Sequence, residues 1–281
     1  MHNIPVYKQF SGEKKIALMD NSTVSFLEKM ERYGISATRE LLRGYDVIFI
    51  PGWVLEEVNA SPYRSQYIEN LISDGFPIYS IAEDSYAQFV DGEEGNLYKI
   101  VNAAVSMLGI LKSYLRRNVQ KEDPIDIVAY SDWITDMYNN WPLSDINTDT
   151  NHKKKKNAGE VSLTILAEII SWYRPESELI TVFTQDCDSY NYQTGAHKQL
   201  KKVFFDRTPV DVSFKSNDFL LYQMYKNKTI TQEKINEVRK DERTVIFTRK
   251  RADQSTALVT KKLNNSQYIE LLGDGTVQII F

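Results

Sequence analysis

The chain has 281 residues and a net charge of −4, enough for one large domain with a sizeable core or for a domain with an appendage. With 42% hydrophobic and 26% charged residues it has an ordinary globular composition, and the mild charge excludes a protein that coats nucleic acid through bulk positive charge, although local basic surfaces stay open. One cysteine excludes an internal disulfide and a multi-cysteine zinc site, and three scattered histidines disfavour a zinc centre.

The beginning of the chain is polar over residues 1–15, so it lacks the apolar core of a signal peptide. No apolar run reaches the length of a membrane-spanning helix. We therefore expect a cytoplasmic protein with no membrane partner. Any metal ion that it binds is expected to have oxygen ligands, because cysteine and histidine are scarce.

Apolar runs and helical periodicity alternate along the first part of the chain. Strands are predicted over residues 15–19, 45–50 and 76–81, and helices over residues 21–43, 53–58, 63–73 and 95–117. The proline in the third strand removes a hydrogen-bond donor, which predicts a position near the edge of a sheet. This alternation is typical of an α/β fold with a mainly parallel central sheet.

The second part of the chain continues the pattern and then changes character. Strands are predicted over residues 179–183 and 210–214, and helices from residue 157, around residues 195–204, and over 217–225 and 231–240. Four short strands are predicted over residues 244–248, 257–261, 267–272 and 277–281. We therefore predict a main domain over residues 1–240 and a small antiparallel β appendage over residues 241–281, too small to be stable alone.

The least regular stretch, about residues 123–157, is predicted to be an insertion or long loop with some local structure. It contains four consecutive lysines, Lys153, Lys154, Lys155 and Lys156. Such a run is usually a solvated charged surface. A basic loop just before a candidate catalytic acid could instead hold a phosphate backbone, and the sequence leaves both interpretations open.

Acidic residues follow two of the predicted strands directly. Asp20 closes the strand over residues 15–19, and Asp186 and Asp188 follow the strand over residues 179–183. Taken singly, each acid is explained as a helix cap or the start of a turn. In an open α/β sheet, however, ligands bind beyond the carboxyl ends of the strands, so acids at these points face a crevice.

Two further acids are predicted at the same edge of the sheet. Glu57 opens the helix after the second strand, and Glu160 lies in the first turn of a strongly apolar helix. Together with Asp20 and Asp186 they would repel one another and raise one another's pKa values if no cation were present. Mg²⁺ or Mn²⁺ relieves that repulsion with oxygen ligands, and such a site suits hydrolysis of phosphodiesters.

At these positions the chain resembles the PIN-domain nucleases, a family of Mg²⁺- or Mn²⁺-dependent enzymes that mostly cut RNA. Asp20, followed by Asn21 and Ser22, looks like the first acid of the family. Residues 50–58 look like the second motif, whose glutamate precedes an aliphatic residue, and this favours Glu57 over Glu56.

The later motifs of that family have counterparts as well. Gly159-Glu160 looks like its third acid, and Thr184-Gln185-Asp186 looks like its threonine-x-aspartate motif. The resemblance implies catalytic residues Asp20, Glu57, Glu160 and Asp186, metal ligands Asp20, Glu160, Asp186 and Asp188, and supporting residues Asn21, Ser22 and Thr184.

The resemblance further implies a three-layer α/β/α domain and a Mg²⁺- or Mn²⁺-dependent endoribonuclease acting on single-stranded or structured RNA. DNA stays open as a substrate, since nothing in the sequence reads a 2′-hydroxyl. The roles that this resemblance implies are RNA turnover, a toxin–antitoxin pair or defence against mobile elements, with a second copy of the chain or an inhibitory protein as partner. The segment 123–157 and the β-rich tail depart from the small members of the family.

Two alternatives compete with this interpretation. One is a catalytically silent PIN-like protein that binds nucleic acid or a partner, against which the retention of every acid argues. The other is a phosphatase of the haloacid-dehalogenase type, which requires an acid two residues after its nucleophile, where Ser22 stands after Asp20. Cys187 is expected to pack rather than react, since neighbouring carboxylates raise a thiol's pKa. His197 could serve as a base or a phosphate contact, but the expectation is an ordinary surface histidine on a helix.

Overall fold

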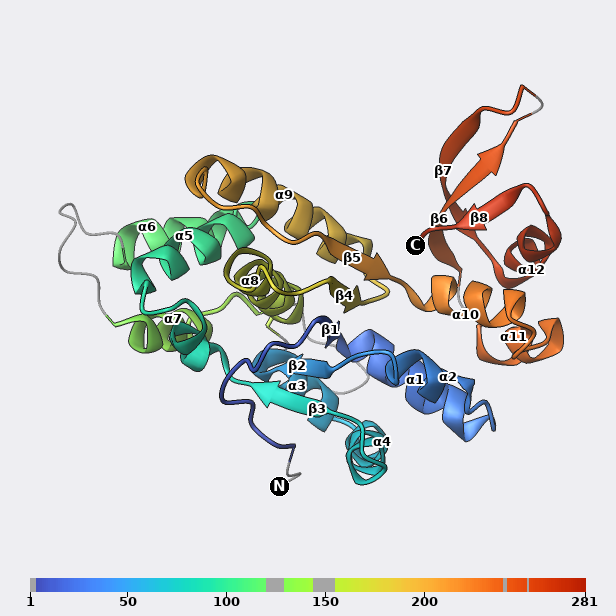
Figure 1. Ribbon diagram of the computed structural model, residues 1–281, viewed down its shortest axis with the longest axis horizontal. Helices are drawn as coiled ribbons and strands as arrows, with labels where there is room; N and C mark the ends of the chain where they lie inside the picture. The colour runs from blue at the N-terminus through green and yellow to red at the C-terminus, as the bar shows by residue number, and fades with distance from the viewer. Residues whose placement is uncertain (1–3, 120–128, 144–154, 240–241, 252) are drawn as a thin grey trace.

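Five parallel strands form the main sheet of the computed structural model, which describes residues 4–119, 129–143, 155–239, 242–251 and 253–281 (Figure 1). They are β1 (Lys15–Met19), β2 (Val47–Pro51), β3 (Ile78–Ile81), β4 (Leu179–Phe183) and β5 (Val212–Lys215). The order across the sheet is β3-β2-β1-β4-β5, and every neighbouring pair is parallel. The predicted α/β class with a parallel sheet is confirmed, as is the edge position of β3.

Helices connect the strands on both sides of this sheet. The first connections contain α1 (Asn21–Arg32), α2 (Ala37–Leu42), α3 (Gly52–Asn59) and α4 (Pro62–Ser73). The long connection from β3 to β4 contains the 3-10 helix η1 (Glu83–Phe89), α5 (Glu94–Ala104), α6 (Gly109–Asn118), α7 (Tyr130–Asn139) and α8 (Ala158–Tyr173). The last elements of this part are α9 (Cys187–Val203), α10 (Asn217–Lys226) and α11 (Gln232–Val238).

The strand order decides which helices share a layer. Right-handed crossovers from β1 to β2 to β3 place α1 to α4 on one face, and the return to β4 and β5 places α5, α8 and α9 on the other. Packing agrees, since α1 contacts α3 and α4, whereas α8 contacts α5 and α9. The sheet is therefore the middle of three layers.

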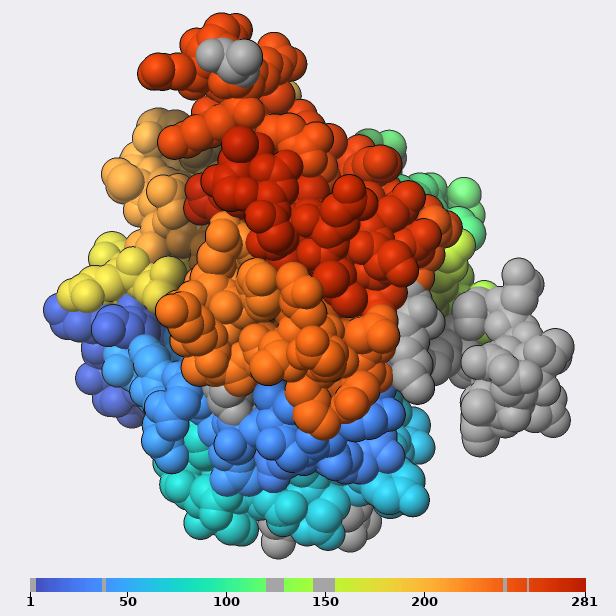
Figure 2. All heavy atoms as spheres, turned by 90° about the vertical axis from the view of Figure 1, so that its right-hand side faces the viewer, coloured from blue at the N-terminus to red at the C-terminus, as the bar shows by residue number. Residues whose placement is uncertain are grey.

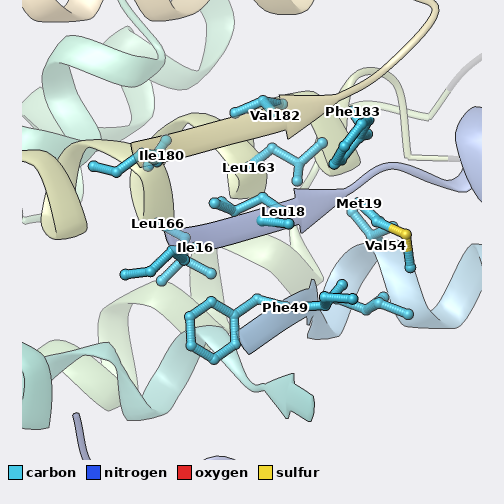
Figure 3. Packing of buried hydrophobic residues seen from close by; sticks show 14 of the residues in the cluster. Ile16, Leu18, Met19, Phe49, Val54, Leu163, Leu166, Ile180, Val182 and Phe183 are labelled. Atoms are coloured by element: carbon cyan, nitrogen blue, oxygen red, sulfur yellow. The ribbon is translucent and has the colours of Figure 1, made fainter. Parts of the chain in front are cut away.

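Helix α8 occupies the centre of its layer, and nearly all of its residues are buried. A helix that is apolar all round must be covered on every side. Figure 3 shows Leu163 and Leu166 of α8 beside Leu18 of β1 and Ile180 and Val182 of β4. This packing fixes the first turn of α8 at the carboxyl edge of the sheet, where it meets α3.

Several predicted element boundaries were wrong. The helix expected over residues 21–43 ends at Arg32, because Gly34 adopts a φ of 75° and turns the chain toward α2. The helix expected over residues 95–117 is interrupted at residues 105–108 and forms α5 and α6. The helix expected around residues 195–204 begins earlier, at Cys187, where the Asp186 side chain caps it.

The C-terminal region forms a second, antiparallel sheet of order β7-β6-β8. Its strands are β6 (Arg243–Lys250), β7 (Thr256–Leu263) and β8 (Val277–Ile279). The strand predicted over residues 267–272 is instead helix α12 (Asn265–Gly273). Asn264 and Gln267 form a capping box at its start, and Tyr268, Leu271 and Leu272 recur at helical spacing on its buried side.

A buried ion pair between α10 and the residue after α11 forms hydrogen bonds to the C-terminal region. The Arg239 guanidinium donates to both carboxylate oxygens of Asp218, at 3.0 and 3.1 Å, and to the Leu263 carbonyl at 3.1 Å. The Tyr268 hydroxyl donates to the Asp218 carbonyl at 2.6 Å. Figure 2 shows the C-terminal sheet seated on α10 and α11, which in turn lie against α1, where Lys29 Nζ donates to the Val238 carbonyl at 2.9 Å. The domain boundary at residue 240 stays a prediction.

In the ranges that the structure describes, no helix combines the length and the apolar character that crossing a bilayer requires.

Candidate functional site

The four acids predicted to be catalytic lie at the carboxyl edge of the main sheet, each on a different segment. Asp20 follows β1, Glu160 is in the first turn of α8, and Asp186 follows β4. Glu57 was predicted to open the helix after β2, and this was wrong: α3 begins at Gly52, so Glu57 lies in the last turn of that helix. Helices α1, α3, α8 and α9 all begin at this edge. The positive ends of the dipoles of α1, α8 and α9 lie beside Asp20, Glu160 and Asp186 and partly offset the repulsion among these acids.

Asp20 is the most enclosed of the four acids, with 8% of its surface exposed. Its Oδ1 accepts from the Asn21 N–H at 2.7 Å, and its Oδ2 accepts from the hydroxyls of Ser22 at 2.6 Å and Thr184 at 3.0 Å. Burial raises the pKa of Asp20, and these hydrogen bonds act against that rise by favouring the ionised form. The carboxylate is thus held in one orientation at the end of β1.

Thr184 and Ser22 connect the ends of β1 and β4. The Thr184 hydroxyl donates to Asp20 and accepts from the Asp186 N–H at 3.1 Å. The Ser22 hydroxyl likewise donates to Asp20 and accepts from the Gln185 N–H at 3.1 Å. These paired bonds fix the turn after β4 against the turn after β1, so the Asp20 carboxylate and the backbone of Asp186 are joined through a shared hydroxyl.

Glu57 faces the same edge, whereas its neighbour Glu56 does not. The Asn21 Nδ2 donates to Glu57 Oε2 at 3.1 Å. Glu56 is exposed and accepts from the Tyr138 hydroxyl at 2.6 Å, on the side of α3 that faces α7. Arg64 donates to the backbone carbonyl of Glu57 at 2.9 Å, so a cation also lies near this acid.

The first turn of α8 lies against these acids. A Cβ placed on Gly159 would lie 3.6 Å from Glu57 Oε1 and 4.0 Å from Asp20 Oδ1. Glu160 follows directly, and burial together with the charges of Asp20, Asp186 and Glu57 raises its pKa to about 8. Its carboxyl group therefore retains a proton at neutral pH, which is the expected response of a like-charged cluster.

Asp186 and Asp188 lie at the open side of the site. Both are exposed, and Asp186 Oδ1 accepts from the Asp188 N–H at 2.8 Å as the cap of α9. Cys187 between them is half-buried, and burial followed by the charges of Asp186 and Asp188 raises its pKa. Its thiol is therefore poorly suited to act as a nucleophile.

The oxygen donors at this edge match the preference of hard divalent cations. Asn21 Oδ1 is buried with no hydrogen-bond donor among the described residues, which leaves a free oxygen ligand beside Glu57. Within the described ranges, no lysine or arginine forms an ion pair with Asp20, Glu160 or Asp186. No three His, Cys, Asp or Glu side chains of those ranges are close enough together to hold a metal ion. The acids influence one another's titration without forming a metal cage.

The lysine run is only partly described. Lys153 and Lys154 lie outside the described residues. The Lys155 Nζ lies 3.1 Å from the centroid of the Tyr138 ring, which itself stacks on Trp53 of α3. Lys155 is thus committed to a cation–π contact that helps to hold the insertion against α3, and the exposed Lys156 is the one described member of the run without such a contact.

Sequence reasoning missed one acid at the same edge of the sheet. Glu83 follows β3, is 4% exposed, and accepts from the Trp53 N–H at 2.9 Å and from the Ser162 hydroxyl. It therefore caps α3 and ties it to α8. The rule that singled out Asp20, an acid just beyond a strand, would have found it.

His197 was expected to be an ordinary surface histidine, and this was wrong. Its Nδ1 lies 3.2 Å from Glu168 Oε2, and only 19% of its side chain is exposed. Glu168 is fully buried in α8 and also accepts from Trp172 Nε1 and Gln193 Nε2, each at 2.6 Å. No local sequence pattern joins His197 to Glu168, because this contact depends on how α9 packs on α8.

The chain matches no protein-family model, and no curated protein matches its sequence. The function is therefore inferred from the geometry of the site.

Proposed function

We propose that this protein is a Mg²⁺- or Mn²⁺-dependent endoribonuclease of the PIN-like type, which hydrolyses phosphodiester bonds of single-stranded or structured RNA. The observation that carries the proposal is the placement of Asp20, Glu57, Glu160 and Asp186 at one sheet edge, without an ion-pair partner for three of them among the described residues. Such an arrangement is costly unless a cation binds there.

The chemistry follows from oxygen ligands and a phosphodiester. A bound Mg²⁺ or Mn²⁺ would supply positive charge at the phosphoryl oxygen and acidify a coordinated water. Asp20, Glu160 and Asp186 would hold it, with Asp188 as a further ligand, after moving closer together than they are in the metal-free protein. In the hydrolysis, the water oxygen bonds to phosphorus, the ester P–O bond breaks, and a proton passes to the leaving oxygen.

Other residues of the site act through these acids. Ser22 and Thr184 orient the Asp20 carboxylate, and Asn21 orients Glu57 by donating to it. Glu160 holds a proton at neutral pH in the metal-free protein because its pKa is about 8. Cation binding would release that proton, because the ligand must be ionised.

The proposal is tested by cleavage of a labelled single-stranded RNA in the presence of Mn²⁺. Asp20→Asn and Asp186→Asn should each abolish cleavage while leaving the circular dichroism spectrum unchanged. Binding of Mn²⁺ alone, measured by isothermal titration calorimetry, should weaken in both variants. Full cleavage activity in both would refute the metal site.

The adjacent glutamates provide a matched pair of variants. Glu57→Gln should lose most of the activity because its side chain faces Asn21 and Asp20. Glu56→Gln removes the same charge one residue away, where the side chain bonds Tyr138, and should retain activity. Equal losses of activity in the two variants would show that the loss comes from removing a negative charge from α3, and not from the position of Glu57 in the site.

A second candidate is a catalytically silent PIN-like protein that binds nucleic acid or a partner. It is favoured by the absence of three close ligand side chains within the described ranges. This candidate predicts RNA binding without Mn²⁺-dependent cleavage and without a calorimetric signal for Mn²⁺. DNA in place of RNA is tested in the same assays.

A further inference from the structure

A hollow of about 370 Å³ lies between α9 and β5, outside the carboxylate site. Tyr190, His197, Lys198 and Lys201 of α9 line one side, and Phe214 of β5 lines the other. Asp211 is the one acid in the lining. The hollow therefore combines aromatic rings with an excess of cationic side chains.

The hollow begins next to the proposed active site. Asp186 caps the start of α9, and Tyr190 lies about one turn further along the same helix. From Tyr190, the lining residues Thr194, Lys198 and Lys201 recur at spacings of three and four, so they form one stripe along α9. At a rise of about 1.5 Å per residue, the stripe extends roughly 16 Å away from Tyr190.

The end of the hollow nearest the site is aromatic. Tyr190 is 48% exposed, so much of its side chain is open to solvent. Its ring meets Phe214 edge to face, with centroids 5.5 Å apart and an interplanar angle of 88°. This contact holds the Tyr190 ring in place and leaves surface on which an unstacked base can lie.

The far end of the hollow is cationic. Lys198 and Lys201 are exposed, and neither forms an ion pair with any described residue. His197 is held beside them through its Nδ1 by the buried Glu168, and no described residue bonds its Nε2. Unpaired ammonium groups in a groove are suited to the phosphates of a nucleic-acid backbone.

We propose that this hollow holds the single-stranded RNA substrate on its way to or from the carboxylate site, an inference that rests on the proposed function. A base stacks on Tyr190, one turn from Asp186, and the following phosphates lie against Lys198 and Lys201. Single-stranded RNA fits better than a duplex, since stacking on a side chain requires an unpaired base.

The test measures binding of a fluorescent single-stranded RNA by anisotropy, in EDTA so that no metal-dependent cleavage occurs, over a series of salt concentrations. Lys198→Gln and Lys201→Gln should each reduce the slope of log affinity against log salt by about 0.7, the value for one phosphate contact on a single strand. Tyr190→Ala should weaken binding about tenfold, as expected for loss of one stacked base, with the slope unchanged.

Lys8→Gln is the matched control. Lys8 is exposed on the segment that pairs with β3, at the opposite edge of the sheet from β5. Its loss removes the same charge and should leave the slope unchanged. If the Lys198→Gln and Lys201→Gln variants behave like Lys8→Gln, or if the wild-type protein binds no RNA, binding of RNA in the hollow is refuted.

Failure of this inference is distinguishable from failure of the proposed function. Mn²⁺-dependent cleavage with unchanged slopes in the α9 variants would refute the path and leave the nuclease intact. Reduced slopes without any cleavage by the wild-type protein would support the path and refute the nuclease. Thermal unfolding of each variant verifies that binding changes are not caused by loss of the fold.

Discussion

Replacing Glu83 with glutamine tests how a buried carboxylate responds to its surroundings. Glu83 is 4% exposed, and burial is the main reason that its pKa rises from the usual 4.5 to about 7. Between these two values the folded protein holds a proton that the unfolded chain has released. The contribution of Glu83 to the free energy of unfolding therefore falls as the pH rises from about 4.5 to about 7, and it is constant above that.

The size of this effect follows from the pKa difference. At 1.36 kcal/mol for each pKa unit, deprotonation of Glu83 lowers the free energy of unfolding by at most about 3 kcal/mol across that range. Glu83→Gln has no titrating group at this position, so its stability should decline less steeply by that amount. The test compares how the free energy of unfolding changes with pH, not its value at one pH. The substitution also changes stability at every pH, because the glutamine amide group donates a hydrogen bond where the carboxylate accepts one.

The assay is urea denaturation followed by tryptophan fluorescence at intervals between pH 4.5 and pH 8. Asp84→Asn provides the control, since it removes a charge from the exposed neighbouring residue. The free energies of unfolding of wild type and Glu83→Gln should diverge with pH, whereas those of wild type and Asp84→Asn should stay parallel. Parallel curves for Glu83→Gln would refute the assigned burial effect.

Two further predictions concern stability. Gly52→Ala should lower the free energy of unfolding by about 1–3 kcal/mol, because the new Cβ would lie 2.5 Å from Glu83 Oε2 and 3.3 Å from the Ala82 Cα. The control is Gly95→Ala on α5, whose new Cβ meets nothing within 4 Å, and this variant should be neutral or stabilising. Asp218→Asn leaves the Arg239 guanidinium buried without its counter-ion and should lower the free energy of unfolding by about 3–5 kcal/mol. The control Glu242→Gln breaks the exposed pair with Lys262 and should lower it by less than about 1 kcal/mol. Urea denaturation measures both, and equal effects of Asp218→Asn and Glu242→Gln would contradict the role given to burial.

The candidate site also shows why a charge pattern in sequence can be interpreted at all. An acid directly after an apolar strand lies at a known edge of the sheet, because the carboxyl ends of all parallel strands are at the same edge. Asp20 and Asp186 follow β1 and β4, which are neighbours in the sheet, so their proximity follows from the strand order. The metal and the reaction stay predictions.

Local sequence determined the strands of this protein, most of its helices and the edge at which its acids lie. Those features depend on periodicity and on strand termini, and both are encoded within a few residues. The prediction of a strand over residues 267–272 was wrong, because a short apolar run is compatible with both the strand period and the helix period. The capping box at Asn264 favours the helix.

Only the tertiary structure decided which partner each acid meets. It directed Glu56 to Tyr138 and Glu57 to Asn21, although the two glutamates are adjacent in the chain. It likewise joined Glu168 to His197 across two packed helices. The physical reason is that burial and electrostatic neighbours depend on how separate elements pack, and no local pattern contains that information.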